Sequence, residues 1–532
     1  MRRMFSSQRI GLYWRTTRYL KPEQLWRRIA FKLFPPSVSR NALPGCGKAI
    51  ELRTRFPDGY RGLTGAGRFR FLNDERVFPG WNDPACNKLW LYNLHYFDLL
   101  RQAGLTEDDG RRWIAKWIAE NPPFSGNGWE PYPISLRIVN WIKWAVSGHS
   151  LDGAASASLA LQARFLSRRT ERHLLANHLL ANAKALVFAG CFFTGPEAAK
   201  WLDTGLAIYR EQLPEQILAD GGHFERSPMY HSIILEDLLD LLNIGAPLEL
   251  GDTVRHMLDW LAVLTGPDGR IAHLNDAADG IALTPEALFK YGEELGFSRP
   301  GRVTACRDLP QTGYARLTDG EWTLICDGAP IGPDYQPGHA HADTLTFELW
   351  HGTTRLVVDS GTGEYIDTPL RREQRGTAGH NTLTVDGANS SEVWGAHRVA
   401  ARARIVERRF SDSSFSAAHD GFRRMTHRRE WRISAAGVHI RDRIGGSGVH
   451  TVDMYWHLSP SAEVESLDGR VAWRSEGKRF VLMLPAAVEH AIETGHCSPE
   501  FGKSLSHPVV HCRHRGKLPF EAETTINMEQ DI

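Results

Sequence analysis

Two histidines stand one residue apart in the segment 338–343, which reads Gly-His-Ala-His-Ala-Asp. On an extended segment alternate side chains point to the same face, so the rings of His339 and His341 would lie together. Asp359 and His380 stand at the ends of other strand-like stretches. Two imidazoles and one carboxylate make a three-point zinc site with an open fourth position. The alternative interpretation is a hydrogen-bonded polar cluster at a sheet edge.

A second group of reactive side chains occupies the segment 220–231, in which a glycine-rich loop leads into a helix. The start of that helix would present Glu225, Arg226, Tyr230 and His231. A tyrosine beside arginine and histidine can have its phenol pKa lowered from about 10, which makes it a proton shuttle near neutral pH. The competing interpretation is a helix N-terminus with solvated charges.

The pair Asn177-His178 interrupts an otherwise apolar helical stretch, 174–182. Burying an amide and an imidazole costs free energy unless each is hydrogen-bonded. The presence of this polar pair in an apolar helix therefore calls for an explanation. Taken alone, it indicates a hydrogen-bonded core histidine.

Aromatic and polar groups gather at two predicted helix starts, 94–98 and 127–137. Such groups suit sugar stacking, and Arg137 suits the pairing of a carboxylate. Ordinary core packing of the aromatic rings is the competing interpretation. The candidate sugar-binding residues of these two segments are His95, Tyr96, Asn127, Trp129, Glu130, Tyr132 and Arg137.

The spacing at which apolar residues recur changes along the chain, and with it the type of element that must position these groups. From about residue 90 to 296 the apolar residues recur at helical spacing, and several segments are apolar on nearly all sides, which favours an inner ring of helices wrapped by outer ones. The predicted helices are 89–103, 107–120, 134–146, 154–170, 173–193, 197–212, 228–243, 251–264 and 285–295.

Beyond about residue 309 the period becomes two and turn signals separate the segments, which predicts an antiparallel sandwich. Examples of predicted strands are 344–350, 355–358, 382–385, 429–433 and 479–484. The predicted organisation is a basic extension over 1–80 that packs on the body, a helical domain over 81–305 and a sandwich over 306–532.

Composition excludes several classes of function. Among 532 residues, 63 Lys and Arg balance 62 Asp and Glu, and the net charge of +1 argues against a general grip on nucleic acid. No apolar run approaches the roughly 20 residues that a membrane helix requires. The seven cysteines are scattered without a Cys-x-x-Cys pair, which indicates neither a disulfide framework nor a cysteine zinc site.

The first 40 residues carry ten Lys and Arg but only one acid, Glu23, and lack the apolar core of a secretory signal. Such a segment could lie on anionic lipid or polymer as a basic amphipathic helix. We instead expect it to pack on the body of the protein through apolar anchors, which are Leu25, Trp26, Ile29, Phe31 and Leu33.

Taken together, the motifs resemble those of the bacterial heparinase II/III-like polysaccharide lyases, a family with an N-terminal α/α-toroid and a C-terminal antiparallel β-sandwich. Their order agrees from about residue 90 to the end of the sheet region: Asn177-His178, Tyr230, His339-Ala-His341, Val-Val-Asp359-Ser-Gly and His380-Asn-Thr. Each motif alone is weak evidence for the resemblance, whereas the whole set of motifs is specific. The fold expected from the resemblance is an incomplete toroid followed by the sandwich.

The resemblance implies β-elimination in a uronic-acid polysaccharide. An enzyme for this reaction must neutralise the uronate carboxylate and stabilise the charge that grows as the C5 proton leaves. Asn177 and His178 match the neutralising position, Tyr230 the proton-transfer residue and His339 a second acid/base or charge-stabilising position. His341, Asp359 and His380 match a metal position that looks structural, and this ligand set suits zinc better than calcium.

A local row of Arg137, Arg226 and Arg375 is expected to bind the uronate, with Glu225 and His231 beside it. The expected partner is therefore an acidic polysaccharide, whether a glycosaminoglycan or a bacterial exopolysaccharide. Family members act in the periplasm or cell envelope, with the cytoplasm as the alternative here. The sequence indicates no oligomeric state and no choice between endo and exo action.

Two other functions remain open. A glycoside hydrolase on the same architecture would need paired carboxylates across the cleft, for which Glu130 and Glu225 are the candidates. A non-catalytic glycan-binding protein of exopolysaccharide assembly would need none of the acid-base groups.

Overall fold

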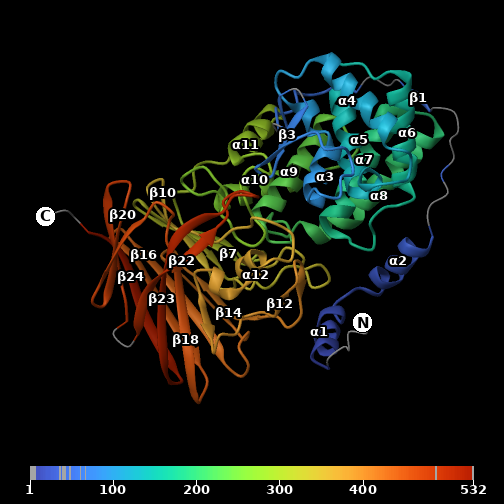
Figure 1. The fold of residues 1–532 in the computed structure, drawn as a ribbon. Coiled ribbons are helices and arrows are strands. Elements are labelled where there is room, and N and C mark those ends of the chain that lie inside the picture. The colour runs from blue at the N-terminus through green and yellow to red at the C-terminus, as the bar shows by residue number, and fades with distance from the viewer. Residues whose placement is uncertain are drawn as a thin grey trace.

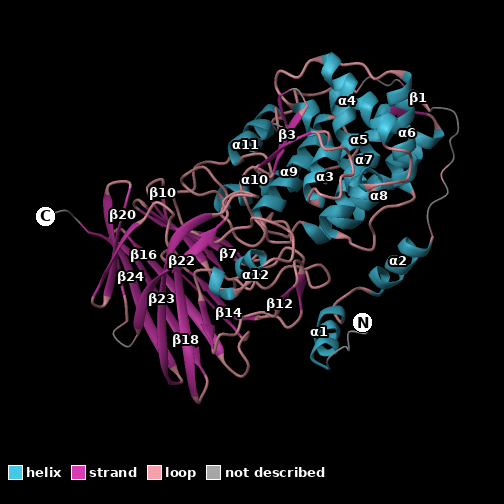
Figure 2. Cartoon of the chain, viewed as in Figure 1, coloured by secondary structure: helices cyan, strands magenta, loops and turns pink. Residues whose placement is uncertain are grey.

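The computed structural model describes residues 7–34, 38, 44–46, 50–59, 62–65, 67–485 and 488–529. A helical half comes first in the chain, and a half built of strands follows. Loops from each half lie between the two (Figure 1). Figure 2 shows the same division by secondary structure. This order confirms the predicted fold class, a toroid of helices followed by antiparallel sheets.

The helical half is built on helices joined by short connections. They are α3 (Lys88–Tyr96), α4 (Glu107–Glu120), α5 (Pro131–Val146), α6 (Gly153–Ser167), α7 (Ala176–Phe192), α8 (Pro196–Gln216), α9 (Pro228–Asn243), α10 (Gly251–Leu264) and α11 (Pro285–Glu294), with the 3-10 turns η1 (Asp98–Arg101) and η2 (Asn127–Trp129). A small sheet of β2 (Leu63–Gly65), β3 (Arg68–Phe71) and β4 (Asp74–Val77) precedes them, and β1 (Gly45–Cys46) pairs with β5 (Phe193–Thr194).

Helix α7 is an inner helix of this half. Its residues 179–189 are buried on every side, and it packs against α5, α8 and α9. An all-round apolar helix gains stability only where neighbours cover each of its faces, so the sequence of α7 requires the outer helices.

Several predicted helix boundaries differ from the structure by three residues or more, and two of these differences come from backbone conformations that periodicity does not reveal. The predicted helix 89–103 ends at Tyr96, because Phe97 adopts a left-handed φ of 64° before η1. The predicted helix 173–193 begins only at Ala176, because Leu175 has a φ of 65°. A left-handed Leu costs on the order of 1–3 kcal/mol, and such strain concentrates at functional sites.

The strand half forms three main sheets in which every pairing is antiparallel. The sheet orders are β10-β9-β8-β7-β6, β11-β18-β23-β22 and β14-β15-β16-β17-β24-β21-β20-β19. The strands of these sheets are β6 (Arg307–Leu309), β7 (Tyr314–Asp319), β8 (Trp322–Asp327), β9 (Phe347–His351), β10 (Thr354–Val357), β11 (Leu383–Val385), β14 (Ile405–Phe410), β15 (Ser414–His419), β16 (Thr426–Ser434), β17 (Gly437–Gly445), β18 (Val449–His457), β19 (Glu463–Leu467), β20 (Arg470–Ser475), β21 (Lys478–Met483), β22 (Glu489–Cys497), β23 (Leu505–Lys517) and β24 (Phe520–Glu529).

Alternation along the strands fills the core of this half. In β16 the buried and less buried positions alternate, and Trp431 enters a core shared with Phe347 of β9 and Trp456 of β18. The helix α12 (Pro369–Arg375), the turn η3 (Thr377–Gly379) and the small hairpin of β12 (Val393–Trp394) and β13 (Arg398–Val399) lie in loops of this half.

The helices α1 (Ser7–Thr17) and α2 (Pro22–Leu33) lie outside both halves (Figure 1). They contact the body, but most of the predicted anchors do not: Leu25, Trp26, Ile29 and Leu33 are exposed, and Phe31 alone of the five is half-buried. The contacts come from the polar face of α2, where Gln24 is buried. Among the described helices, none has the length and apolar character that crossing a bilayer demands.

Candidate active site

A cavity of about 770 Å³ lies between the two halves. Six of the predicted site residues line it, and they come from α3, α5, α7, α9 and the loop before β9: Tyr96, Tyr132, Asn177, His178, Tyr230 and His339. Tyr92, Tyr335, Tyr365 and His397 also line it. The cavity therefore joins groups that lie more than 200 residues apart in the sequence.

Tyr230 and His339 form the meeting point of the two halves. Tyr230 stands in the first turn of α9, which Ser227 caps by accepting a hydrogen bond from the Tyr230 backbone N at 3.2 Å. Its ring stacks on His339 with 3.9 Å between centroids, and its hydroxyl lies 3.1 Å from that of Tyr365. The phenol thus lies beside an imidazole in a position to exchange a proton with a bound molecule.

The pKa of Tyr230 is raised well above its ordinary value, chiefly because burial disfavours the phenolate. This corrects the prediction of a lowered pKa. The groups expected to lower it point elsewhere: Arg226 Nε donates to the Thr312 carbonyl at 2.9 Å, and His231 Nε2 donates to the Met257 carbonyl at 3.0 Å. Tyr230 is therefore a protonated phenol, suited to donate a proton.

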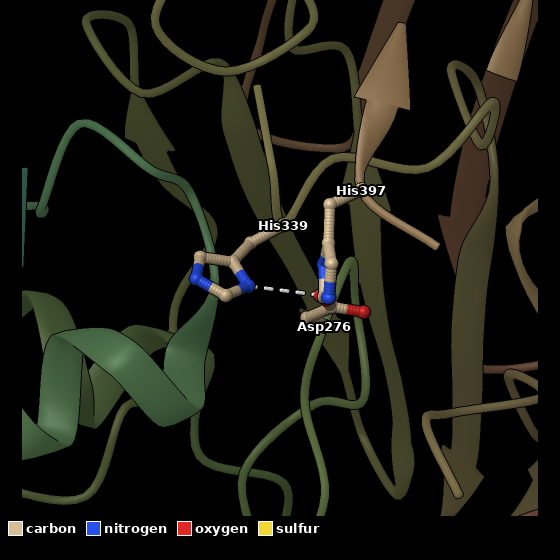
Figure 3. A group of neighbouring side chains, drawn as sticks. All are labelled: Asp276, His339 and His397. Carbon is tan, nitrogen blue, oxygen red and sulfur yellow. Dashed lines mark hydrogen bonds and ion pairs between the residues drawn. The ribbon is translucent and has the colours of Figure 1, made fainter. Parts of the chain in front are cut away.

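Asp276 fixes the ring of His339 (Figure 3). His339 Nδ1 lies 2.9 Å from Asp276 Oδ2. Burial opposes ionisation of Asp276, but the Arg371 guanidinium and two histidine donors hold the pKa of this carboxyl well below its usual range. Because an ionised carboxylate only accepts, Nδ1 of His339 carries a hydrogen toward Asp276, and Nε2 is the ring nitrogen that remains for other partners.

Glu225 lies on the other side of His339, with 3.5 Å between its Oε2 and His339 Nε2. Its Oε1 accepts hydrogen bonds from Asn177 Nδ2 at 2.9 Å and from the Asn177 backbone N at 3.2 Å. The left-handed Leu175 and Ala176 bring this first turn of α7 to the carboxylate. The amide predicted to neutralise a substrate carboxylate is thus paired with Glu225.

His178 faces the cavity with 30% of its side chain exposed. Its Nδ1 lies 3.2 Å from Glu171 Oε1, and its ring contacts that of Tyr132 at 4.6 Å between centroids, with the two planes tilted by 45°. Burial alone would lower the pKa of His178, but the Glu171 carboxylate, by charge and hydrogen bond, raises it overall. The site therefore has a histidine that favours its cationic form.

Two buried histidine nitrogens beside Asp343 are suited to hold a metal ion. His341 Nε2 gives its hydrogen to Asp276 at 2.8 Å, and His380 Nδ1 gives its hydrogen to Asp359 at 2.8 Å. The remaining nitrogens, His341 Nδ1 and His380 Nε2, are buried without a hydrogen-bond partner. Buried lone pairs beside a carboxylate fit a divalent cation.

The carboxylate of this group is not the predicted one. His341 and His380 come together as expected, but their ligand atoms group with Asp343, whereas Asp359 orients His380 from the opposite ring nitrogen. Burial raises the pKa of Asp343 to about 6. A second group, Asp276 with His339 and His397, is less suited to a metal because Arg371 already occupies both oxygens of Asp276.

Two arginines of the predicted row, Arg137 and Arg375, are buried and donate their hydrogen bonds to groups of the protein itself. Arg137 donates to Gln162 Oε1 at 2.9 Å and to the Gly128 carbonyl at 2.7 Å, and stacks on Trp117. Arg375 donates to the carbonyls of Ala340 and Gly395, each at 2.9 Å. These buried arginines position backbone segments. The exposed cations that line the cavity, among the residues described, are Arg28, Arg70 and Arg398.

Several other predicted binding residues belong to the core of the helical half. His95 is fully buried, with Nε2 at 2.9 Å from the Trp81 carbonyl and Nδ1 accepting from Trp117 Nε1 at 3.0 Å. Trp129 is buried against Trp117. Glu130 is bound by Lys88 and Tyr92 and, like Asn127, is not among the residues that line the cavity. The core interpretation holds for His95 and Trp129, whereas Asn127 and Glu130 are half-buried outside the cavity.

Sequence reasoning missed Asp276, Tyr365 and Arg371, and it included Asp343 in the histidine motif without giving it a role. Asp276 and Asn275 follow His273 in the run His-Leu-Asn-Asp, which lies in the loop between α10 and α11. Asn275 Oδ1 accepts from the His341 backbone N at 3.0 Å, so this run holds the loop with the two histidines. A polar run between apolar segments was the available signal.

Replacement of Arg137 tests its structural role. We expect Arg137→Met to lower the free energy of unfolding by about 2–4 kcal/mol, because Gln162 and the buried carbonyls lose their donors. Denaturant unfolding measures the loss. The folded variant should bind acidic polysaccharide as the parent does, and selective loss of that affinity with unchanged stability would restore the ligand-binding role.

These features define a class of protein: a helical toroid and an antiparallel sandwich with a Tyr/His cavity between them. The Heparinase II/III N-terminus family model matches residues 115–288, and the Heparinase II/III-like, C-terminal model matches residues 301–521. The chain belongs to the heparinase II/III-like family.

Among curated relatives, a heparin-sulfate lyase of Bacteroides stercoris is 23% identical over 367 residues, which are 62% of this chain and 53% of that protein. The FtsZ-localized protein C of Caulobacter vibrioides is 25% identical over 393 residues, 66% of this chain and 63% of that protein. The matches thus span about half to two thirds of these relatives. A solved heparinase III has the same fold, with a TM-score of 0.68 at 19% identity over 95% of this chain and 89% of that one.

Proposed function

We propose that this protein is a polysaccharide lyase that cleaves a uronate-containing polysaccharide by β-elimination. The observation that carries the proposal is the stack of Tyr230 on His339 in a cavity that also presents His178. The family relatives named as heparin-sulfate lyases support the reaction class.

The roles follow from the protonation states. His178, held toward its cationic form by Glu171, neutralises the uronate carboxylate and so makes the C5 proton more acidic. His339 Nε2 accepts that proton, because Asp276 keeps the hydrogen on Nδ1. Tyr230 donates its phenol proton to the oxygen that leaves C4. The C5–H bond and the C4–O bond break, a C4–C5 double bond forms, and no water is consumed.

The remaining groups position these three. Asn177 holds Glu225 against His339, and Arg371 holds Asp276. The two halves contribute different partners, since Tyr230 and His178 come from helices and His339 from the strand half. The packing between the halves therefore sets the distance between acid and base.

A panel of uronate polymers tests this function, with heparan sulfate, chondroitin sulfate, hyaluronan, alginate and bacterial exopolysaccharides as substrates. We expect at least one to yield products with the absorbance of an unsaturated uronate. Saturated reducing ends without that absorbance would instead indicate a hydrolase, and binding without any product would indicate a glycan-binding protein.

We further propose that His341, Asp343 and His380 hold one structural divalent metal, zinc by the chemistry of two imidazoles and one carboxylate. When bound, the metal ties the loop 338–343 to η3 and so fixes His339 two residues away. Asp359 then acts through His380, whose ring it orients.

Metal content tests this assignment independently of activity. We expect about one zinc per chain by elemental analysis, almost none in His341→Ala, and a lower melting temperature after chelation. Asp343→Asn should lose the metal, whereas Asp359→Asn should bind it roughly 10–100-fold more weakly. Full loss in Asp359→Asn with retention in Asp343→Asn would make Asp359 the ligand, and a metal-free parent indifferent to chelators would remove the site.

A further inference from the structure

Helix α2 carries its apolar stripe on the side that faces solvent. Leu25, Trp26, Ile29 and Leu33 follow helical spacing and lie on one face, and their side chains are 48–66% exposed. An amphipathic helix on a globular protein normally turns this face to the core. Here the opposite, polar face meets the body.

The contacts of the inner face fix this orientation. Lys21, the residue before α2, donates to Glu215 Oε1 of α8 at 2.6 Å and lies over the Tyr335 ring. Gln24 is buried and donates to the Tyr335 carbonyl at 3.3 Å. The Phe31 ring packs against that of His173 with 4.1 Å between centroids. The apolar stripe is therefore held outward by specific contacts.

Helix α1 also turns large apolar side chains to solvent. Ile10 and Trp14, one turn apart, are 59% and 69% exposed. On the inner side, Arg15 Nη2 donates to Glu392 Oε1 at 2.7 Å, and Thr16 Oγ1 accepts from Trp394 Nε1 at 3.0 Å. The inner side of α1 also contributes Thr16 to the cavity.

This surface is unusual for the molecule. Half of the large apolar side chains exposed in the described residues lie between 10 and 34. They are Ile10, Tyr13, Trp14, Leu25, Trp26, Ile29, Leu33 and Phe34. Tyr13 lines the cavity and packs edge-on against Trp394, so it does not belong to the outward surface. Contiguous exposed apolar groups of this kind mark an interaction site.

The charges around the stripe select its partner. Arg9 of α1, Arg18 in the turn after it and Lys32 of α2 are exposed, and the one acid of the two helices, Glu23, is bound by Arg27 at 3.1 Å. Basic side chains flanking tryptophan and branched aliphatic groups match an interface with anionic headgroups above acyl chains. A hydrated polysaccharide would leave the aliphatic groups uncovered.

We propose that α1 and α2 together form a surface, named here the α1–α2 face, that docks on an anionic lipid bilayer with both helices lying in the headgroup region. Because the inner side of α1 lines the cavity, docking would hold the cleft between the two halves at the membrane. The inference is independent of the proposed lyase reaction.

Vesicle flotation of the full chain tests the proposal. We expect the protein to float with vesicles of 70% phosphatidylcholine and 30% phosphatidylglycerol, to bind phosphatidylcholine vesicles much less, and to lose binding as salt rises. The double variants Trp26→Gln/Ile29→Gln and Arg18→Glu/Lys32→Glu should each weaken binding by roughly tenfold or more. A double variant of equally exposed valines on the strand half, Val406→Gln/Val449→Gln, is the matched control and should bind as the parent.

Circular dichroism and melting temperature establish that each variant folds. Failure to float with the anionic vesicles would overturn the proposal, as would equal binding of all three variants. Two further outcomes would also overturn it. The first is a dimer in sedimentation velocity that the Trp26→Gln/Ile29→Gln variant abolishes while vesicles stay unbound, and the second is retention of soluble polyuronate, but not vesicles, by the α1–α2 face.

Discussion

Tyr230→Phe should fold and bind acidic polysaccharide as the parent does, yet turn substrate over about 10²–10⁴-fold more slowly. The substitution removes only the hydroxyl, whose hydrogen is the proton for the leaving oxygen, and keeps the ring that stacks on His339. Initial rates of unsaturated product, compared at saturating substrate, measure the loss. The effect should fall on kcat rather than on KM, because the proton moves in the transition state.

Tyr335→Phe is the matched control. Tyr335 lines the same cavity, but its ring lies beneath Lys21 instead of stacking on His339. We expect its loss of turnover to stay below tenfold. If the two variants lose activity equally, or if Tyr230→Phe retains near-parent turnover, Tyr230 is not the acid.

His178→Gln is expected to reduce kcat/KM by about 10²–10³-fold, because a neutral amide replaces the cation that meets the uronate carboxylate. Since the pKa of His178 is raised, the cation is present below that pKa and is lost as the pH rises through it. The activity of the parent should therefore fall on the alkaline side as His178 deprotonates.

Glu171→Gln tests whether His178 causes this alkaline limb, that is, the fall of activity at high pH. Glu171 is the main group that raises the pKa of His178, with Glu225 adding a smaller effect, and the uncharged Tyr132 ring contacts the imidazole. Removing the carboxylate should move the alkaline limb to lower pH while leaving the rate at low pH near that of the parent. An unmoved limb would mean that another group titrates there.

The fold could be predicted because the spacing of apolar residues indicates which face of each helix or strand is buried. The helices 107–120, 228–243 and 251–264 have the observed bounds, since Thr106, Ser227 and the alternation of apolar faces are local signals. The bends at Phe97 and Leu175 were not predictable, because left-handed conformations of bulky residues depend on the packing around them.

The reactive side chains of the site could be predicted from the sequence, but the residues that hold them in place could not. Histidine and tyrosine motifs marked Tyr230, His178 and His339, which meet in the cavity. Arg137, Arg226 and Arg375 were assigned to substrate because an arginine in sequence gives no sign of burial. In the structure their donors reach backbone carbonyls, an arrangement that only the tertiary fold creates.

In the N-terminal helices the sequence suggested burial where the structure shows exposure. Leu25, Trp26, Ile29 and Leu33 have the spacing of core anchors, and the sequence alone cannot say which side of an amphipathic helix faces the protein. The partners of Lys21 and Gln24 decide this, and both lie more than 190 residues away.

Mass spectrometry of the products from a defined uronate oligosaccharide tests the central claim most directly. β-Elimination predicts one fragment with an unsaturated uronate at its new end, so that the two fragments together have the mass of the substrate. Fragments that together exceed the substrate by one water, with no unsaturated end, would show hydrolysis and contradict the assignment of Tyr230 and His339 as the acid and base of an elimination.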